Sequence, residues 1–170
     1  MSNKGEPNGP VRSSKIDVGR LEQVDPSLLL AHFRDPRIGR HLPLLTDDWD
    51  LERIAGFVAA KAAYWDRDGL GHWAFWIDDA YAGWGGFQKE GDDWDFGLVL
   101  VPDHYSRGRE IADFAFRWLV RETDIREVTF LLPETRSPRA LTRLGARATG
   151  DVVHDGTRFT RWALTLPEPG

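Results

Sequence analysis

Apolar residues recur at every third or fourth position in several stretches of the chain, and this period predicts helices. The first is a short helix that begins at Pro26, with Asp25 as its N-cap. A longer helix follows the acidic residues 46–50 and runs to about Trp65, since acidic side chains suit the positive end of a helix dipole.

The helical period is clearest in the second half of the chain. One predicted helix presents a continuous apolar face, formed by Ile111, Phe114, Ala115, Trp118 and Leu119. A last short helix is predicted over residues 138–144, where Gly145 provides a natural C-cap.

Shorter apolar stretches, bounded by Gly, Pro and Asp, predict strands. They lie at residues 15–24, 72–77, 81–89, 94–101, 127–132, 146–153 and 157–166. Turns at residues 78–80 and at Asp155-Gly156 predict hairpins. The order of elements indicates one mixed α/β domain over residues 15–167, after a polar tail of residues 1–14 that we expect to be disordered.

Three glycines, Gly83, Gly85 and Gly86, fall inside one predicted strand. Their spacing matches neither of the standard phosphate-binding motifs. We therefore expect a bulge, or a place where bulky neighbours cross the strand.

The composition excludes several kinds of protein. The 170-residue chain has no cysteine, which removes disulfides, thiolate zinc sites and a cysteine nucleophile. Its five histidines are scattered, so no metal is expected, and its net charge of −5 argues against binding nucleic acid. No apolar run is long enough for a membrane span or a secretion signal, so we expect a cytoplasmic protein without a membrane partner.

The chain contains eight tryptophans, of which four lie close together: Trp73, Trp76, Trp84 and Trp94. We favour a large aromatic core, because tryptophan is highly buried on average. The alternative is a substrate groove, and in its extreme form an aromatic-lined carrier for an apolar ligand.

A polar segment, residues 103–110, joins a predicted strand to a predicted helix. The first N–H groups of a helix lack internal partners and carry partial positive charge, so they suit an anion. Gly108 would let a phosphate approach the backbone, and Arg107 and Arg109 would add charge. The residues by themselves thus predict a pyrophosphate site only in general form.

Three segments, in order along the chain, resemble the GNAT acetyltransferases. The stretch from Asp35-Pro36 to residues 65–74 is similar to the branch that includes the ribosomal-protein N-terminal alanine acetyltransferases. Residues 98–110 resemble the family's acetyl-CoA motif, a fourth strand followed by the pattern Gln/Arg-x-x-Gly-x-Gly/Ala. Residues 132–145 are similar to the family segment Pro-Glu-Asn…Ser-x-Arg-x-Leu…Leu-Gly-Phe.

The resemblance implies a mostly antiparallel central sheet, flanked by helices, in which the fourth and fifth strands splay apart. Acetyl-CoA is then the co-substrate, with its pantetheine arm along the fourth strand and its pyrophosphate on the loop that follows. The cofactor-binding residues implied are Val99, Leu100, Val101, Tyr105, Ser106, Arg107, Gly108, Arg109 and Glu110.

The resemblance also implies direct attack of the acceptor amine on the thioester, without an acyl-enzyme. Asp95, at the start of the fourth strand, is the candidate general base; otherwise it is an exposed carboxylate at a strand end. His72 is a second candidate base, although a lone histidine is more often structural. Ser137 matches a proton donor of this branch, or is a helix N-cap followed by Pro138.

Four residues depart from the family pattern. Glu110 stands where a small residue usually closes the pyrophosphate loop, and it must turn away or pair with Arg107 or Arg109. Leu141 occupies the place of the tyrosine that protonates the leaving thiol in many relatives. Glu134 replaces an asparagine that commonly contacts the cofactor, and Tyr105 replaces the usual Gln or Arg.

These observations support two main functions. The first is an N-acetyltransferase for a primary amine, such as a protein N-terminus, an amino sugar or a small metabolite, and a homodimer is common among such proteins. The alternative is a catalytically impaired GNAT-fold module that binds CoA or a partner. Asp92, Asp93 and Asp95 would favour a cationic acceptor if they face the groove.

Overall fold

The computed structural model describes residues 15–39 and 48–168. The tail predicted for residues 1–14 lies outside the described residues, as do positions 46 and 47 of the predicted acidic stretch. No helix in the described part of the chain has both the length and the apolar character to cross a membrane.

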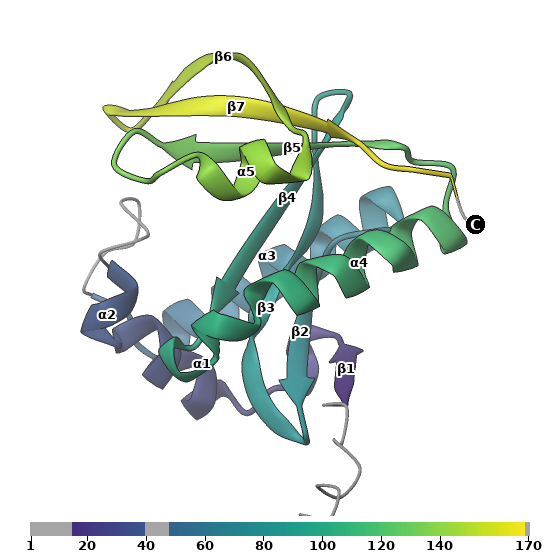
Figure 1. The fold of residues 1–170 in the computed structure, drawn as a ribbon. Coiled ribbons are helices and arrows are strands. Elements are labelled where there is room, and N and C mark those ends of the chain that lie inside the picture. The colour runs from purple at the N-terminus through teal and green to yellow at the C-terminus, as the bar shows by residue number, and fades with distance from the viewer. Residues whose placement is uncertain (1–14, 40–47, 169–170) are drawn as a thin grey trace, which may run out of the picture.

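The described residues form one seven-stranded sheet with the order β1-β2-β3-β4-β5-β7-β6 (Figure 1). Its strands are β1 Ile16–Gly19, β2 His72–Ile77, β3 Ala80–Glu90, β4 Asp93–Leu100, β5 Glu127–Pro133, β6 Arg147–His154 and β7 Thr157–Thr165. The helices are α1 Pro26–Arg34, α2 Pro36–Gly39, α3 Leu51–Asp68, α4 Gly108–Glu122 and α5 Arg139–Leu144, with two 3-10 helices, η1 Leu21–Gln23 and η2 Pro102–Arg107. Neighbouring strands are antiparallel except β4 and β5, which are parallel.

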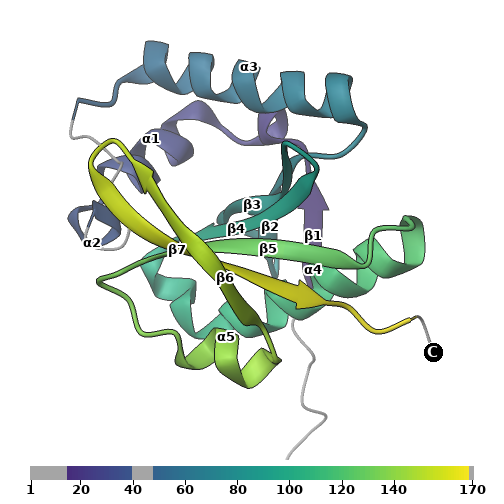
Figure 2. The same cartoon turned by 90° about the horizontal axis from the view of Figure 1, so that it is seen from above.

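Helices cover both faces of the sheet (Figure 2). On one face, α1 and α3 enclose a core with Leu29, Phe33 and Ile54 at its centre. On the other face lies α4, whose Ile111 and Leu119 are fully buried against the sheet, as their helical spacing predicts. The predicted mixed α/β fold is confirmed.

Local signals in the sequence explain the helix ends. The Asp25 carboxylate accepts a hydrogen bond from the Ser27 N–H at 2.8 Å and caps α1, as predicted. Asp50 caps α3 in the same way, through the Arg53 N–H. Gly145 ends α5 in the left-handed conformation with φ +89°, which confirms its predicted role.

The first predicted strand, residues 15–24, is wrong in its second half. The chain leaves the sheet after Gly19 and forms η1. Leu21 and Val24, three positions apart, both reach the core beneath α1 and α3. A strand would send residues at that spacing to opposite faces, so burying both side chains requires a helical turn.

The glycines of β3 allow close contact with β4. A Cβ atom at Gly83 would lie 2.4 Å from the Val99 carbonyl oxygen, and one at Gly85 would lie 2.3 Å from the Gly97 oxygen. Both residues have positive φ angles, +149° and +155°, which favour glycine. Close approach of the β4 backbone therefore explains these two glycines. As expected, they form no phosphate loop, but the nearest neighbours that crowd them are backbone atoms and not bulky side chains.

The clustered tryptophans belong to the core. Trp73 is only 5% exposed, while Trp76, Trp84 and Trp94 are half-buried and pack against the two apolar clusters. This packing confirms the aromatic core and removes the hypothesis of an aromatic-lined carrier.

Candidate active site between strands β4 and β5

Strands β4 and β5 meet at one point and then separate. Only Asp95 and Thr129 face each other as ladder partners. Beyond them a cleft of about 810 Å³ opens between the two strands, with α4 and α5 along its sides. We call it the β4–β5 cleft, and it realises the splayed strand pair that the sequence predicts.

The β4–β5 cleft brings together more than half of the predicted cofactor residues. Those that line it are Val99, Leu100, Tyr105, Gly108 and Arg109. Four others, Val101, Ser106, Arg107 and Glu110, lie nearby in sequence but not in its lining. Arg136 and Arg143 also line the cleft and add positive charge to its wall. They belong to an arginine cluster visible in the sequence, at residues 136–147, but were not among the predicted cofactor residues.

The segment after β4 is more regular than predicted. Residues 103–110 form no polar loop, because Pro102 begins the 3-10 helix η2 and α4 follows directly at Gly108. Gly108 has an ordinary right-handed conformation, with φ −58°, so its backbone does not require glycine. A Cβ atom there would touch Leu100 Cδ1 at 3.5 Å and would otherwise meet no protein atom. The bare backbone of Gly108 therefore borders open space in the cleft.

Glu110 is paired and does not extend unpaired toward the cleft. Its carboxylate accepts a hydrogen bond from Arg107 Nε at 2.7 Å and lies 2.5 Å from a second nitrogen of that guanidinium. This pairing is one of the two ways in which the sequence analysis allowed Glu110 near a pyrophosphate. It also neutralises much of the charge of Arg107, so Arg109 is the stronger cation of the first turn of α4.

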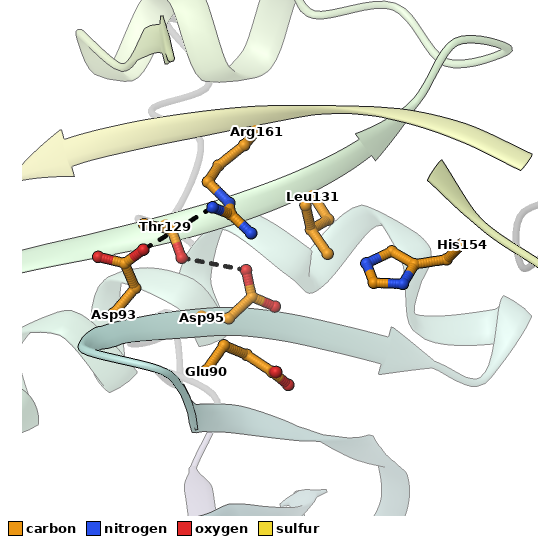
Figure 3. Close-up of a pocket in the computed structure, with 7 residues that line it drawn as sticks. All are labelled: Glu90, Asp93, Asp95, Thr129, Leu131, His154 and Arg161. Carbon is orange, nitrogen blue, oxygen red and sulfur yellow. Dashed lines mark hydrogen bonds and ion pairs between the residues drawn. The ribbon is translucent and has the colours of Figure 1, made fainter. Parts of the chain in front are cut away.

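A second, smaller cavity of about 90 Å³ lies beside Asp95 (Figure 3). We call it the Asp95 cavity; its walls come from five strands and are formed by Glu90, Asp93, Asp95, Thr129, Leu131, His154 and Arg161. Figure 3 shows Asp93, Asp95 and Arg161 directed toward one another, with 3.9 Å between the carboxylate of Asp93 and the guanidinium of Arg161.

Asp95 is a partly buried acid and not an exposed carboxylate at a strand end. Thr129 Oγ1 donates a hydrogen bond to Asp95 Oδ1 at 3.2 Å. Burial raises the pKa of Asp95 to about 7, against the opposing effect of this hydrogen bond, and Glu90 adds to the rise. A carboxyl group with such a pKa can take up and release a proton near neutral pH.

Leu131 lies in the walls of both hollows. It follows Thr129 on β5, on the side where the strand turns away from β4. The Asp95 cavity and the β4–β5 cleft are therefore neighbours that share the Leu131 side chain.

His72 lies outside the lining of both hollows. It is 8% exposed, and burial lowers its pKa well below the usual value. Its ring packs beside Trp84, with 5.6 Å between the centroids. These contacts favour the structural interpretation of His72 over that of a second base.

Ser137 lines the cleft, although its capping role differs from the expected one. Pro138, one residue later, occupies the N-cap position of α5. Ser137 Oγ accepts a long hydrogen bond, 3.4 Å, from the Arg139 N–H. Its hydroxyl proton is not used in that bond, so Ser137 can still donate toward the cleft.

The structure also places Leu141 and Glu134, two of the residues that depart from the family pattern. Leu141 is a wall residue of the cleft and contributes no polar atom. Glu134 lies outside the lining of the cleft, and its Oε1 is 3.7 Å from Nε of the exposed Arg158.

Comparison with known proteins identifies the fold. No protein-family model and no curated protein matches the chain. Among solved structures, a GNAT-family acetyltransferase from Bacillus anthracis matches with a TM-score of 0.69 and 14% identity over 90% of this chain and 96% of that one. The protein yncA from Salmonella typhimurium, solved with its cofactor acetyl-CoA, has a TM-score of 0.60 and 14% identity, with 90% and 95% of the chains covered.

A third similar structure is a spermidine N-acetyltransferase chimera from Vibrio cholerae, with a TM-score of 0.67, 8% identity and 88% and 95% coverage. Identities this low establish the fold alone. The chain therefore has the GNAT acetyltransferase fold.

Proposed function

We propose that the protein is an N-acetyltransferase that moves an acetyl group from acetyl-CoA to a primary amine. The observation that carries this proposal is the adjacency of the two hollows at Leu131. One is a long cleft along the β4 edge that β5 leaves unpaired, and the other holds a partly buried acid with a pKa near neutral. A donor and an acceptor would meet between them.

The residues of the cleft suit acetyl-CoA. Val99 and Leu100 would pair with the pantetheine arm, because β4 has no ladder partner on this side beyond Asp95. Val101, the third residue expected there, already donates its N–H to Ala82 and accepts from His104. No side chain caps the N-terminus of α4, although its Gly108 N–H already donates to the Tyr105 carbonyl of η2. The N–H groups that follow Gly108, with Arg109, would therefore hold the pyrophosphate. The bound cofactor supplies the activated acetyl group.

The chemistry assigned to the chain is proton transfer. The acceptor reaches the Asp95 cavity as an ammonium ion and must lose one proton before its nitrogen lone pair can form the new C–N bond. Asp95 accepts that proton, directly or through a water molecule. After the C–N bond forms, the nitrogen carries one surplus proton, which it releases as the C–S bond breaks. The thiolate takes a proton at the same time from the Ser137 hydroxyl in the cleft wall, the candidate donor, and the proton released by the nitrogen restores that hydroxyl.

The amine is proposed to be an α-amino group, as at a protein N-terminus. Such groups have a pKa of about 8, whereas a lysine side chain has a pKa of about 10.4. The pKa of an α-amino group lies roughly one unit above that of Asp95, which is about 7, whereas the pKa of a lysine side chain lies roughly three units above it. Asp95 therefore takes a proton from an α-amino group more easily than from a lysine. This agrees with the sequence resemblance to N-terminal alanine acetyltransferases.

Calorimetric titration with CoA and acetyl-CoA, followed by a thiol-release assay, tests the proposal. The acceptor panel contains a short peptide with a free N-terminus, the same peptide with a blocked N-terminus and one lysine, and a polyamine. We expect micromolar binding of acetyl-CoA and the fastest turnover with the free N-terminus. Absence of binding at millimolar cofactor would overturn the proposal.

Binding without turnover of any amine would instead support a CoA-binding module. One observation favours that second function: Leu141 gives the cleft wall no hydroxyl where many relatives have the tyrosine acid. Restoring the hydroxyl with Leu141→Tyr separates the two hypotheses, because only an impaired enzyme would gain activity from it.

A further inference from the structure

Lys61 is a partly buried cation beneath the Asp95 cavity. It comes from the middle of α3, and its Nζ lies 5.3 Å from the ring centre of Trp84 and 5.5 Å from that of Phe57. Burial lowers the pKa of Lys61 to about 8. A cation is costly to bury unless polar partners compensate, so its partners carry structural information.

Its hydrogen-bond partner is Gln88 on β3. Lys61 Nζ donates to Gln88 Oε1 at 2.9 Å, and Gln88 Nε2 donates to Glu90 Oε1, also at 2.9 Å. An ammonium group only donates and an ionised carboxylate only accepts, so a glutamine between them is stable in one orientation. The chain of bonds from Lys61 therefore fixes the amide of Gln88 and, through it, the carboxylate of Glu90.

These hydrogen bonds lead from Lys61 to the Asp95 cavity. Glu90 is one of its wall residues, and Gln88 is the ladder partner of Asp95 on the neighbouring strand β4. The carboxylates of Glu90 and Asp95 both raise the pKa of Lys61, in opposition to its burial. An electrostatic interaction between two groups is mutual, so the Lys61 ammonium favours the ionised form of Asp95.

Building on the proposed acetyl transfer, we propose that Lys61 is a positioning residue of the acceptor site, which holds Glu90 at the cavity wall through Gln88 and keeps Asp95 able to ionise. Other charged or titratable groups act on Asp95 from the surrounding strands. Glu90 and Asp93 oppose its ionisation, Arg161 supports it, and His154 lies in the cavity wall on β6. On the other side, Lys61 acts on the buried His72 and lowers its pKa.

The arrangement resolves a conflict within the site. Carboxylates attract an ammonium ion, but each one also makes the ionisation of Asp95 harder. A cation placed behind the cavity offsets that second effect without occupying the space of the acceptor. Lys61 thereby lets the site be acidic and still contain a working base.

The test is Lys61→Met, with the pKa of the Asp95 carboxyl measured by carbon NMR and the pH profile of kcat/KM measured in parallel. We expect the Asp95 pKa and the acidic limb of the profile to rise together by about one unit, as loss of a nearby cation in a partly buried site requires. The matched control is Lys89→Met, which removes the same charge from an exposed position next to Gln88. An Asp95 pKa equal in the two variants would overturn the proposal.

Gln88→Leu tests the positioning role separately. This variant keeps the Lys61 charge but breaks the chain of hydrogen bonds to Glu90. Because one charge-assisted hydrogen bond is lost, KM for the amine should rise about fivefold, with little change in the Asp95 pKa. An unchanged KM would refute the positioning of Glu90.

A reciprocal measurement avoids any variant at position 61. In Asp95→Asn the pKa of Lys61, followed by NMR of its side chain, should fall relative to the wild type. The NMR readings do not depend on acetyl transfer. If Asp95 and Lys61 are coupled but no amine is acetylated, the proposed function fails alone; if turnover occurs and no pKa moves, the role of Lys61 fails alone.

Discussion

The β4–β5 cleft and the Asp95 cavity share Leu131 but are built in different ways. The walls of the cleft come largely from two continuous stretches of chain, β4 with α4 and β5 with α5. The walls of the cavity are single side chains from five strands, β3 to β7. The cleft offers mainly backbone and apolar surface with arginines, whereas the cavity concentrates carboxylates. The difference assigns cofactor binding to one region and proton transfer to the other, and variants can separate them.

The largest expected effect follows from Asp95→Asn. The amide keeps the shape of the side chain and an acceptor for Thr129, but it cannot take a proton. We expect kcat to fall by about 10² to 10⁴, the usual contribution of a positioned base, while the Kd for acetyl-CoA stays within about twofold. Steady-state kinetics and calorimetry measure the two quantities.

The control is Asp92→Asn, because Asp92 is exposed in the turn before β4 and lies outside both hollows. Parallel losses of activity and cofactor affinity in Asp95→Asn would show that the two regions do not divide the work.

A smaller effect is expected from Arg109→Ala in the cleft. Removing one cation from a phosphate site costs about 1.4 kcal/mol or more, so the Kd for CoA should rise at least about tenfold. Arg121→Ala, at the other end of α4, removes the same charge away from the cleft and should leave the Kd unchanged. Equal losses in the two variants would indicate a general charge effect and not a phosphate site.

The same contrast explains what the sequence could predict. The cleft was predictable because its signals are local: Pro102, Gly108 and the helix that follows lie in one short segment with a recognisable order. The prediction failed in detail where short-range geometry decided, since a proline and a run of polar residues formed η2 where a loop was expected. Nothing local distinguishes a 3-10 turn from a loop in such a segment.

The cavity was predictable only in Asp95 and Asp93, two of the three neighbouring aspartates that the sequence offered for a cationic acceptor. Arg161 and His154 reach the cavity from the β6–β7 hairpin. The sequence shows the turn of this hairpin, but it does not show that the hairpin pairs with β5. Lys61 carries no local signal at all, because a lysine on an amphipathic helix is normally in solvent. Pairings between distant strands decide these positions, and a single sequence does not display them.

Gly108→Ala should separate cofactor binding from stability. Its right-handed φ of −58° and the 3.5 Å contact of a new Cβ with Leu100 mean that alanine fits the protein. Alanine is also the better helix former, by up to about 1 kcal/mol, so the melting temperature should stay level or rise. The added methyl borders the cleft, so the Kd for CoA should increase about threefold. Tighter or equal binding would show that no cofactor approaches this backbone.

The smallest expected effect is on stability, and it concerns the cavity alone. In the unfolded chain Asp95 has its ordinary pKa of 3.8, whereas in the folded protein the pKa is about 7. The fold thus prefers the protonated form: its full stability is present below about pH 4 and is lost progressively as the pH rises through about 7. Asp95→Asn cannot ionise and escapes this loss.

The melting temperature of Asp95→Asn relative to the wild type should therefore increase between pH 5 and pH 8. With part of the shift screened by solvent, a gain on the order of 1–2 kcal/mol corresponds to about 5 °C for a chain of this size. Asp92→Asn, scanned over the same range, should show a flat difference. A flat difference for Asp95→Asn as well would mean that Asp95 ionises without cost in the fold, and its role as a base near neutral pH would then have no physical foundation.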